Sequence, residues 1–108
     1  MLERPTEPVR TLSRHEAAVF GAELGGPCAS VDLHGMSVAE ALVELDAVLD
    51  REFMSCTEVV KIVHGRGGQK LRKAVETAIS KHPLVEYWRG SEAPAHAAAV
   101  TFAALSRT

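Results

Sequence analysis

Two short segments of the sequence place a histidine directly before a glycine. The first is Val-Asp-Leu-His-Gly over residues 31–35, and the second is Lys-Ile-Val-His-Gly over residues 61–65. Imidazole titrates near neutral pH, so His34 and His64 are candidates for general acid–base chemistry. Asp32 stands two residues before His34, and on an extended backbone both side chains would point to the same side. The carboxylate could then orient the ring, although the spacing equally fits a strand end whose polar side chains only bind turn amides.

The second segment continues into a glycine-rich loop, His64-Gly65-Arg66-Gly67-Gly68. Glycines let the backbone approach a ligand closely, and the loop leads into a helix whose N-terminal amides and dipole favour an anion. Arg66 could bind phosphate oxygens in bidentate fashion. The glycine spacing matches neither a Walker loop nor a dinucleotide-binding fingerprint. A plain strand-to-helix turn is the simpler alternative, but we predict a phosphate-binding loop that includes Gly65, Gly67 and Gly68.

Charge is unevenly spread along the chain, although the net charge is only −2. Residues 61–73 contain no acidic side chain and five basic ones, Lys61, Arg66, Lys70, Arg72 and Lys73. Such a stretch is a candidate surface for the phosphates of a nucleic acid. The alternative is a solvated helix face. With the glycine-rich loop beside them, we predict that these basic residues bind nucleic acid.

Hydrophobic periodicity predicts the elements that position these residues. Strands are expected at residues 29–34, 58–63, 84–89 and 98–105. One helix is expected over residues 38–53, and a second follows the glycine-rich loop and ends before Pro83. The order βαβαββ predicts a two-layer α/β fold, in which right-handed crossovers make the first two strands parallel. Asp32 and His34 would then lie at the same end of the sheet as the glycine-rich loop, on the face away from the helices.

Residues 1–28 form an extension ahead of the predicted domain at residues 29–108. The first 12 residues are rich in charge and proline, and we expect them to be flexible. Ser13 and Glu16 have the spacing of a capping box, which predicts a short helix after them. This helix could pack on the domain or serve as a docking arm. Because two further helices are too few to cover both faces of a sheet, we expect one face to stay partly open.

Cysteine usage and hydropathy favour a cytoplasmic protein. Cys28 and Cys56 lack the spacing of a disulfide framework or a zinc site, so we expect partly buried thiols in a reducing compartment. The charged N-terminal residues do not resemble a signal peptide. No apolar run approaches the roughly 20 residues that span a membrane. We therefore expect no membrane partner.

Together, the two histidine motifs resemble those of the Smr (small MutS-related) domain family. They are separated by one predicted helix and one predicted strand, and Leu-Arg-Lys-Ala-Val follows the second motif at residues 71–75. The resemblance covers about residues 29–105. It implies a four-stranded mixed sheet in the order 1-2-4-3, similar to the C-terminal domain of translation initiation factor 3. The fourth strand would be central, which agrees with the two-sided apolar pattern of residues 98–105.

Members of this family nick DNA or cleave RNA, some of them at stalled or collided ribosomes. The resemblance therefore implies an endonuclease that acts on RNA or on branched or duplex DNA, with the ribosome as a further candidate partner. It places the family's motifs on Asp32, Leu33 and His34, and on His64 to Gly67. Non-catalytic binding to nucleic acid or to the ribosome is the alternative function.

We assign His34 as the principal acid or base, oriented by Asp32. Arg66 and the loop amides would stabilise the charge that develops on the phosphate. His64 would be a second acid or base, or an anchor for the loop. On DNA, which has no 2′-hydroxyl, water must attack, and Mg²⁺ held partly by Asp32 becomes a candidate cofactor.

Two positions depart from the family pattern. Gln69 stands where the loop usually has another glycine, and Ala97-Ala98-Ala99 stands where a glycine usually precedes the last strand. The first bears on the conformation of the loop, and the second on the rim of the site.

Overall fold

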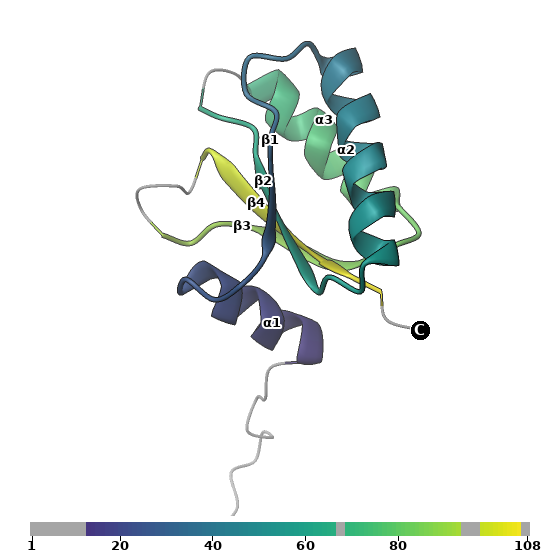
Figure 1. Cartoon of the computed structure of the whole chain (residues 1–108). Helices are drawn as coiled ribbons and strands as arrows, with labels where there is room; N and C mark the ends of the chain where they lie inside the picture. The colour runs from purple at the N-terminus through teal and green to yellow at the C-terminus, as the bar shows by residue number, and fades with distance from the viewer. Residues whose placement is uncertain (1–12, 67–68, 94–97, 107–108) are drawn as a thin grey trace, which may run out of the picture.

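A computed structural model describes residues 13–66, 69–93 and 98–106 (Figure 1). All of the predicted strands and helices form in the predicted order. They are α1 (Arg14–Glu23), β1 (Ala29–Asp32), α2 (Val38–Met54), β2 (Val59–Val63), α3 (Gln69–Lys81), β3 (Val85–Gly90) and β4 (Val100–Leu105). The largest boundary differences are that β1 ends at Asp32, so His34 belongs to the following turn, and that β4 begins two residues late. The N-terminal segment predicted to be flexible, residues 1–12, lies outside the described residues.

The four strands form one mixed sheet in the order β1-β2-β4-β3, as the resemblance implied. β1 and β2 are parallel, and Asp32 stands opposite Val63 at the end of both strands. β4 is central and antiparallel to both of its neighbours, β2 and β3. This arrangement gives β2 a hydrogen-bonded strand on each side, whereas β1 is an edge strand with one neighbour.

Helices α2 and α3 cover one face of the sheet (Figure 1). A capping box begins each of the helices α1 and α2. The side chain of Ser13 accepts a hydrogen bond from the backbone N–H of Glu16, and that of Ser37 accepts one from the backbone N–H of Glu40. The face of the sheet under α2 and α3 is apolar, and Val31 and Leu33 pack there with Leu45, Leu49, Val75 and Ile79. Burying one such side chain contributes about 1.5–3 kcal/mol. Because Val31 and Leu33 must face these helices, Asp32 and His34 are directed away from this core.

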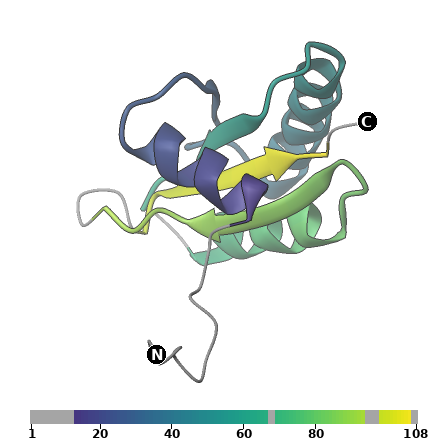
Figure 2. The ribbon, with the colours of Figure 1, turned by 90° about the horizontal axis from the view of Figure 1, so that it is seen from below.

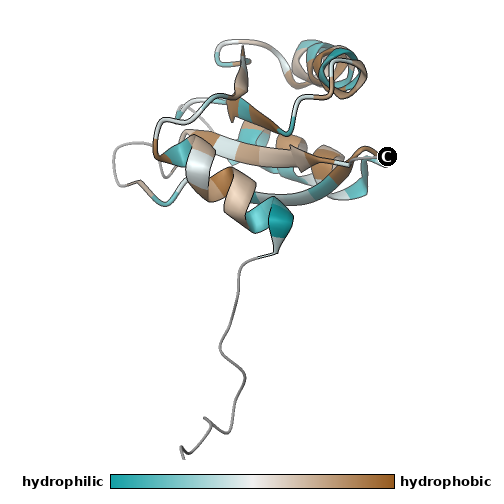
Figure 3. Ribbon diagram, turned by 60° about the horizontal axis from the view of Figure 1, so that its bottom comes forward, coloured by the Kyte–Doolittle hydropathy of each residue, from teal (hydrophilic) through white to brown (hydrophobic). Residues whose placement is uncertain are grey.

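Helix α1 lies across the opposite face of the sheet (Figure 2). It contacts β4, β2 and β3, and its Val19 is fully buried in a second apolar cluster with Val59, Val100 and Phe102. Figure 3 shows that the strands between α1 and the other helices are mainly hydrophobic. The N-terminal helix therefore packs on the domain. The part of this face next to β1 is exposed at Ser30 and Asp32.

The two cysteines differ in exposure. Cys28 is half-buried, as predicted, but Cys56 is exposed, so the prediction is wrong for that residue. Cys56 lies in the turn after α2 with a positive φ of 62°, and such turns lie at the surface. In the part of the chain that the structure describes, no helix is both long and apolar enough to cross a membrane.

Candidate active site

Asp32 and His34 form an exposed hydrogen-bonded pair where the chain leaves β1. His34 Nδ1 lies 2.6 Å from Asp32 Oδ1, and the backbone N–H of His34 donates to the same oxygen at 3.1 Å. These two hydrogen bonds, the one from the ring foremost, lower the pKa of Asp32. Because a carboxylate only accepts, Nδ1 carries the proton and Nε2 is the ring nitrogen that can act on a ligand. The side chains of His34 and Asp32 are 67% and 57% exposed, so the pair is accessible from solvent.

Gly65 brings the glycine-rich loop against His34. Its φ is +81°, and a Cβ at this position would lie 2.9 Å from the Cβ of His34. An L-amino acid would therefore meet both an unfavourable backbone conformation and a steric clash. The structure thus places the ends of β1 and β2, with the two histidine motifs, at one end of the sheet. Gly67 and Gly68 lie outside the described residues.

His64, the corresponding histidine after β2, is buried and only 3% exposed. Its Nε2 lies 2.9 Å from Thr101 Oγ1, and its Nδ1 lies 3.3 Å from the carbonyl oxygen of Gly65. A carbonyl only accepts, so Nδ1 donates to Gly65 and Nε2 accepts from the Thr101 hydroxyl, which is the pattern of a neutral imidazole. Burial lowers the pKa of His64 and the nearby Arg72 acts in the same direction, whereas the hydrogen bond to Gly65 opposes them.

The start of β4 supports the loop through its backbone. The carbonyl oxygen of Ala99 accepts hydrogen bonds from the backbone N–H groups of both His64 and Gly65, each 3.0 Å long. The sequence linked residues 97–99 to the rim of the site, but it did not predict the hydrogen bonds of the Ala99 carbonyl or of Thr101. A backbone carbonyl leaves no side-chain signature, but a threonine in an otherwise apolar strand was a usable signal for Thr101. Of the family departures, Gln69 begins α3 without the positive φ that would require glycine, and Ala97 lies outside the described residues.

A pocket of about 480 Å³ opens between the two motifs. It is lined by the turn at 34–38, the loop at 64–66, and Lys70 and Leu71 in the first turn of α3. Two helix N-termini, those of α2 and α3, meet there, and their dipoles favour an anion. Arg66 and Lys70 add positive charge, and the described residues that line the pocket include no carboxylate. The pocket therefore suits a phosphate group, and Met36 and Leu71 give it an apolar wall.

The predicted basic surface is divided by the fold. Lys70 lies in the pocket wall and Lys73 is exposed on α3, whereas Arg72 is paired with Glu76 at 3.2 Å. Lys61 is in the middle of β2 and shares its face with Val59 and Val63, which pack in the cluster under α1. The structure therefore does not bring Lys61 together with the basic residues of α3.

Among the described residues, Asp32 is not part of a cluster that could hold a metal ion. The group of three found in the part of the chain that the structure describes lies elsewhere, on α2 and just after α3, and consists of Asp46, Asp50 and His82. At the candidate site, Oδ1 of Asp32 already accepts two hydrogen bonds from His34, so this side chain offers one further oxygen. The donor set fits a protein-bound Mg²⁺ poorly, because such ions need several oxygen ligands.

Comparison with known proteins identifies close relatives of this chain. Residues 31–106 match the family model of the Smr domain. The chain is 33% identical over 99 residues to Endonuclease MutS2 of Staphylococcus aureus. This match covers 92% of the chain but only 13% of the length of that protein. It is also similar to the crystal structure of the Smr domain of Thermus thermophilus MutS2, with a TM-score of 0.69 and 32% identity. That match covers 73% of this chain and 99% of the Thermus domain.

Proposed function

Because this chain belongs to the Smr domain family, we propose that it is an endonuclease that cleaves the phosphodiester bonds of RNA, with His34 as its acid–base residue. The observation that carries the proposal is the exposed Asp32–His34 pair beside a pocket whose described lining residues include Arg66 and Lys70 and no carboxylate. Such a pair contributes nothing to the core, whereas it suits proton transfer next to a bound phosphate.

The hydrogen bond to Asp32 sets the role of each ring nitrogen. With its proton on Nδ1, His34 presents a basic Nε2, which would take the proton of the 2′-hydroxyl as that oxygen attacks phosphorus. The bond from phosphorus to the 5′-oxygen then breaks, this oxygen takes a proton from water, and the hydroxide that remains takes back the proton that His34 had accepted. The Asp32 carboxylate stabilises the imidazolium that forms. Arg66, Lys70 and the loop amides offset the charge that develops on the phosphate oxygens.

In this proposal His64 anchors the loop and transfers no proton. Both of its ring nitrogens are already hydrogen-bonded within the protein, and its ring is buried. RNA is favoured over DNA as the substrate, because RNA carries its own attacking group, the 2′-hydroxyl, whereas cleavage of DNA needs an activated water. The residues around the pocket therefore need not hold a metal ion, for which their donor set is poor.

The test uses end-labelled single-stranded RNA and supercoiled plasmid, each with Mg²⁺ and with EDTA. We expect cleavage of RNA in EDTA, leaving a 2′,3′-cyclic phosphate, and at least about a 100-fold loss in His34→Ala. His15→Ala, on α1 and outside the pocket lining, is the matched control and should cleave normally.

Other outcomes identify the alternatives. Nicking of plasmid that requires Mg²⁺ would indicate a metal-assisted DNA endonuclease. Binding of RNA without cleavage, unchanged in His34→Ala, would indicate a non-catalytic module. Binding to ribosomes can be measured separately by co-sedimentation.

A further inference from the structure

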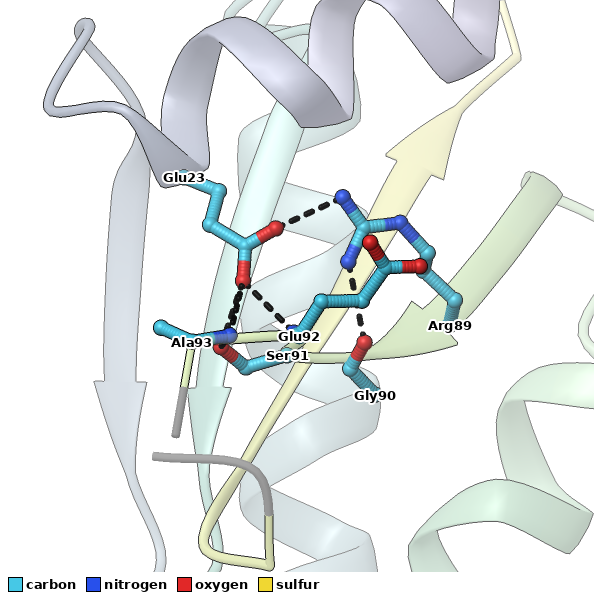
Figure 4. Close-up of polar contacts among 6 residues, drawn as sticks. All are labelled: Glu23, Arg89, Gly90, Ser91, Glu92 and Ala93. Carbon is cyan, nitrogen blue, oxygen red and sulfur yellow. Dashed lines mark hydrogen bonds and ion pairs between the residues drawn. The ribbon is translucent and has the colours of Figure 1, made fainter. Parts of the chain in front are cut away.

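Glu23, the last residue of α1, joins this helix to the end of β3 (Figure 4). Its side chain is only 11% exposed. Oε1 accepts from Arg89 Nη2 at 2.7 Å. Oε2 accepts from Ser91 Oγ at 2.6 Å and from the backbone N–H groups of Glu92 at 2.7 Å and Ala93 at 3.1 Å. Both oxygens of this half-buried carboxylate thus accept hydrogen bonds from a single segment, Arg89 to Ala93.

The chemistry of this contact requires a charged carboxylate. Burial alone would raise the pKa of Glu23, but hydrogen bonds from Ser91, Arg89 and the backbone of Glu92 and Ala93 outweigh it and lower the pKa to about 2. Glu23 therefore stays ionised at any pH at which a cell operates. Hydrogen bonds to an ionised acceptor are about twice as strong as neutral ones, so the contact holds the segment firmly.

The segment that Glu23 holds is bonded directly to the start of β4. The backbone N–H of Ser91 donates to the carbonyl oxygen of Val100 at 2.9 Å, and Gly90 stands opposite Thr101 in the sheet. Thr101 is the residue that bonds the ring of His64, and Ala99, next to Val100, accepts from the site loop. The loop in turn packs against His34 through Gly65. A continuous series of short contacts therefore runs from α1 to the candidate site.

We propose that Glu23 is a positioning residue, which fixes the end of β3 and thereby the start of β4 that supports His64 and Gly65. Helix α1 lies ahead of the residues that match the family model, 31–106, yet it would be part of the working site. The effect on catalysis rests on the function proposed above, whereas the effect on the loop does not.

Glu23→Gln tests this role, because it preserves the shape of the side chain but removes its charge. We expect the amide signals of Gly65 and the ring ¹⁵N signals of His64 to shift in NMR spectra. We also expect kcat for RNA cleavage to fall about tenfold while KM changes less than twofold. Glu23→Asp, which keeps a carboxylate, should recover part of both effects.

Ile79→Val is the matched control, since Ile79 belongs to α3 and is buried in the other apolar cluster. It should lower the melting temperature without shifting the Gly65 and His64 signals. If Glu23→Gln does not fold, Ser91→Ala removes a single hydrogen bond to Glu23 and supports the same measurement.

Unchanged Gly65 and His64 signals in a folded Glu23→Gln protein would overturn the inference. Shifted signals in a protein whose wild type cleaves neither RNA nor DNA would support the positioning role and refute only the proposed function. The NMR measurement therefore tests the positioning role of Glu23, and the cleavage measurement separately tests the proposed function.

Discussion

The two strand–His–Gly segments have similar sequences and opposite surroundings. After β1, the histidine is exposed and bonded to a neighbouring carboxylate, and after β2 it is buried and bonded to β4. The difference follows from the register of the two strands. Asp32 pairs with Val63, so His34 lies one position further along the sheet than His64 and, because side chains alternate, on the opposite side. His64 thus shares a side with Ile62, in the cluster under α2 and α3, where Thr101 of β4 bonds its ring. In the proposed function, the same local motif therefore provides one imidazole for the substrate and one for the framework of the site.

The largest expected difference between the two histidines is in catalysis. His34→Gln should lose at least about 100-fold in cleavage rate while its unfolding free energy changes by less than about 0.5 kcal/mol, as for other exposed positions. His64→Gln should show the reverse, with unfolding free energy lowered by about 1–3 kcal/mol because a buried hydroxyl loses its partner. Cleavage assays and urea unfolding of both variants measure this. Equal losses of stability would contradict the division of roles.

The glycines that follow the two histidines provide a second comparison. Both have similar positive φ values, +83° at Gly35 and +81° at Gly65, so alanine is strained at either position. Only at Gly65 would the new Cβ also clash with His34, whereas the space at Gly35 is open. We expect Gly35→Ala to cost about 1–2 kcal/mol from strain alone. Gly65→Ala should cost more and also reduce cleavage, and equal thermal stability of the two variants would show that the close approach is unimportant.

Acid should weaken the framework through His64. Burial lowers its pKa from the ordinary 6.5, so between the folded and unfolded values the unfolded chain binds more protons than the folded one. The contribution of His64 is therefore complete above pH 6.5 and is lost as the pH falls through its folded pKa. Urea unfolding from pH 7 to pH 5 should show a steeper loss of stability in wild type than in His64→Gln. Parallel curves would mean that His64 titrates alike in both states.

The smallest effect expected is at Arg66. Arg66→Ala should weaken RNA binding and reduce the slope of log affinity against log salt by about one, since one phosphate contact is lost. Lys81→Ala, at the opposite end of α3, is the control and should leave the slope unchanged. Fluorescence anisotropy from low to moderate salt gives both slopes. An unaltered slope in Arg66→Ala would indicate that this residue does not contact the phosphates of the bound RNA.

Local patterns in the sequence predicted much of this fold. The capping box at Ser13 begins a helix where expected, the helix predicted to start at residue 38 does so, and the alternation of Val31 and Leu33 directs Asp32 and His34 away from the helical layer. These features depend on neighbouring residues, so spacing alone reveals them. The same alternation would have separated Lys61 from the basic residues of α3, because a strand residue shares its face with the residues two before and two after it.

Other features of the site could not be predicted because they join distant parts of the chain. The partners of Glu23 lie between 66 and 70 positions later in the sequence. Two of them are backbone amides, which almost any residue would provide. The sequence also left open whether the first helix docks. Its packing brings Val19, with Ala18 and Ala22 beside it, onto a cluster of strand residues that comes together only after the sheet has formed.

The docking of α1 also has a consequence for handling the protein. Residues 59, 100 and 102 are at most 4% exposed beneath this helix, and all three carry large apolar side chains. A shortened chain beginning at residue 29 would keep the whole sheet and both histidine motifs but present this patch to water. Contiguous apolar patches of this kind promote self-association, so the shortened chain should aggregate at concentrations at which the full chain stays dispersed.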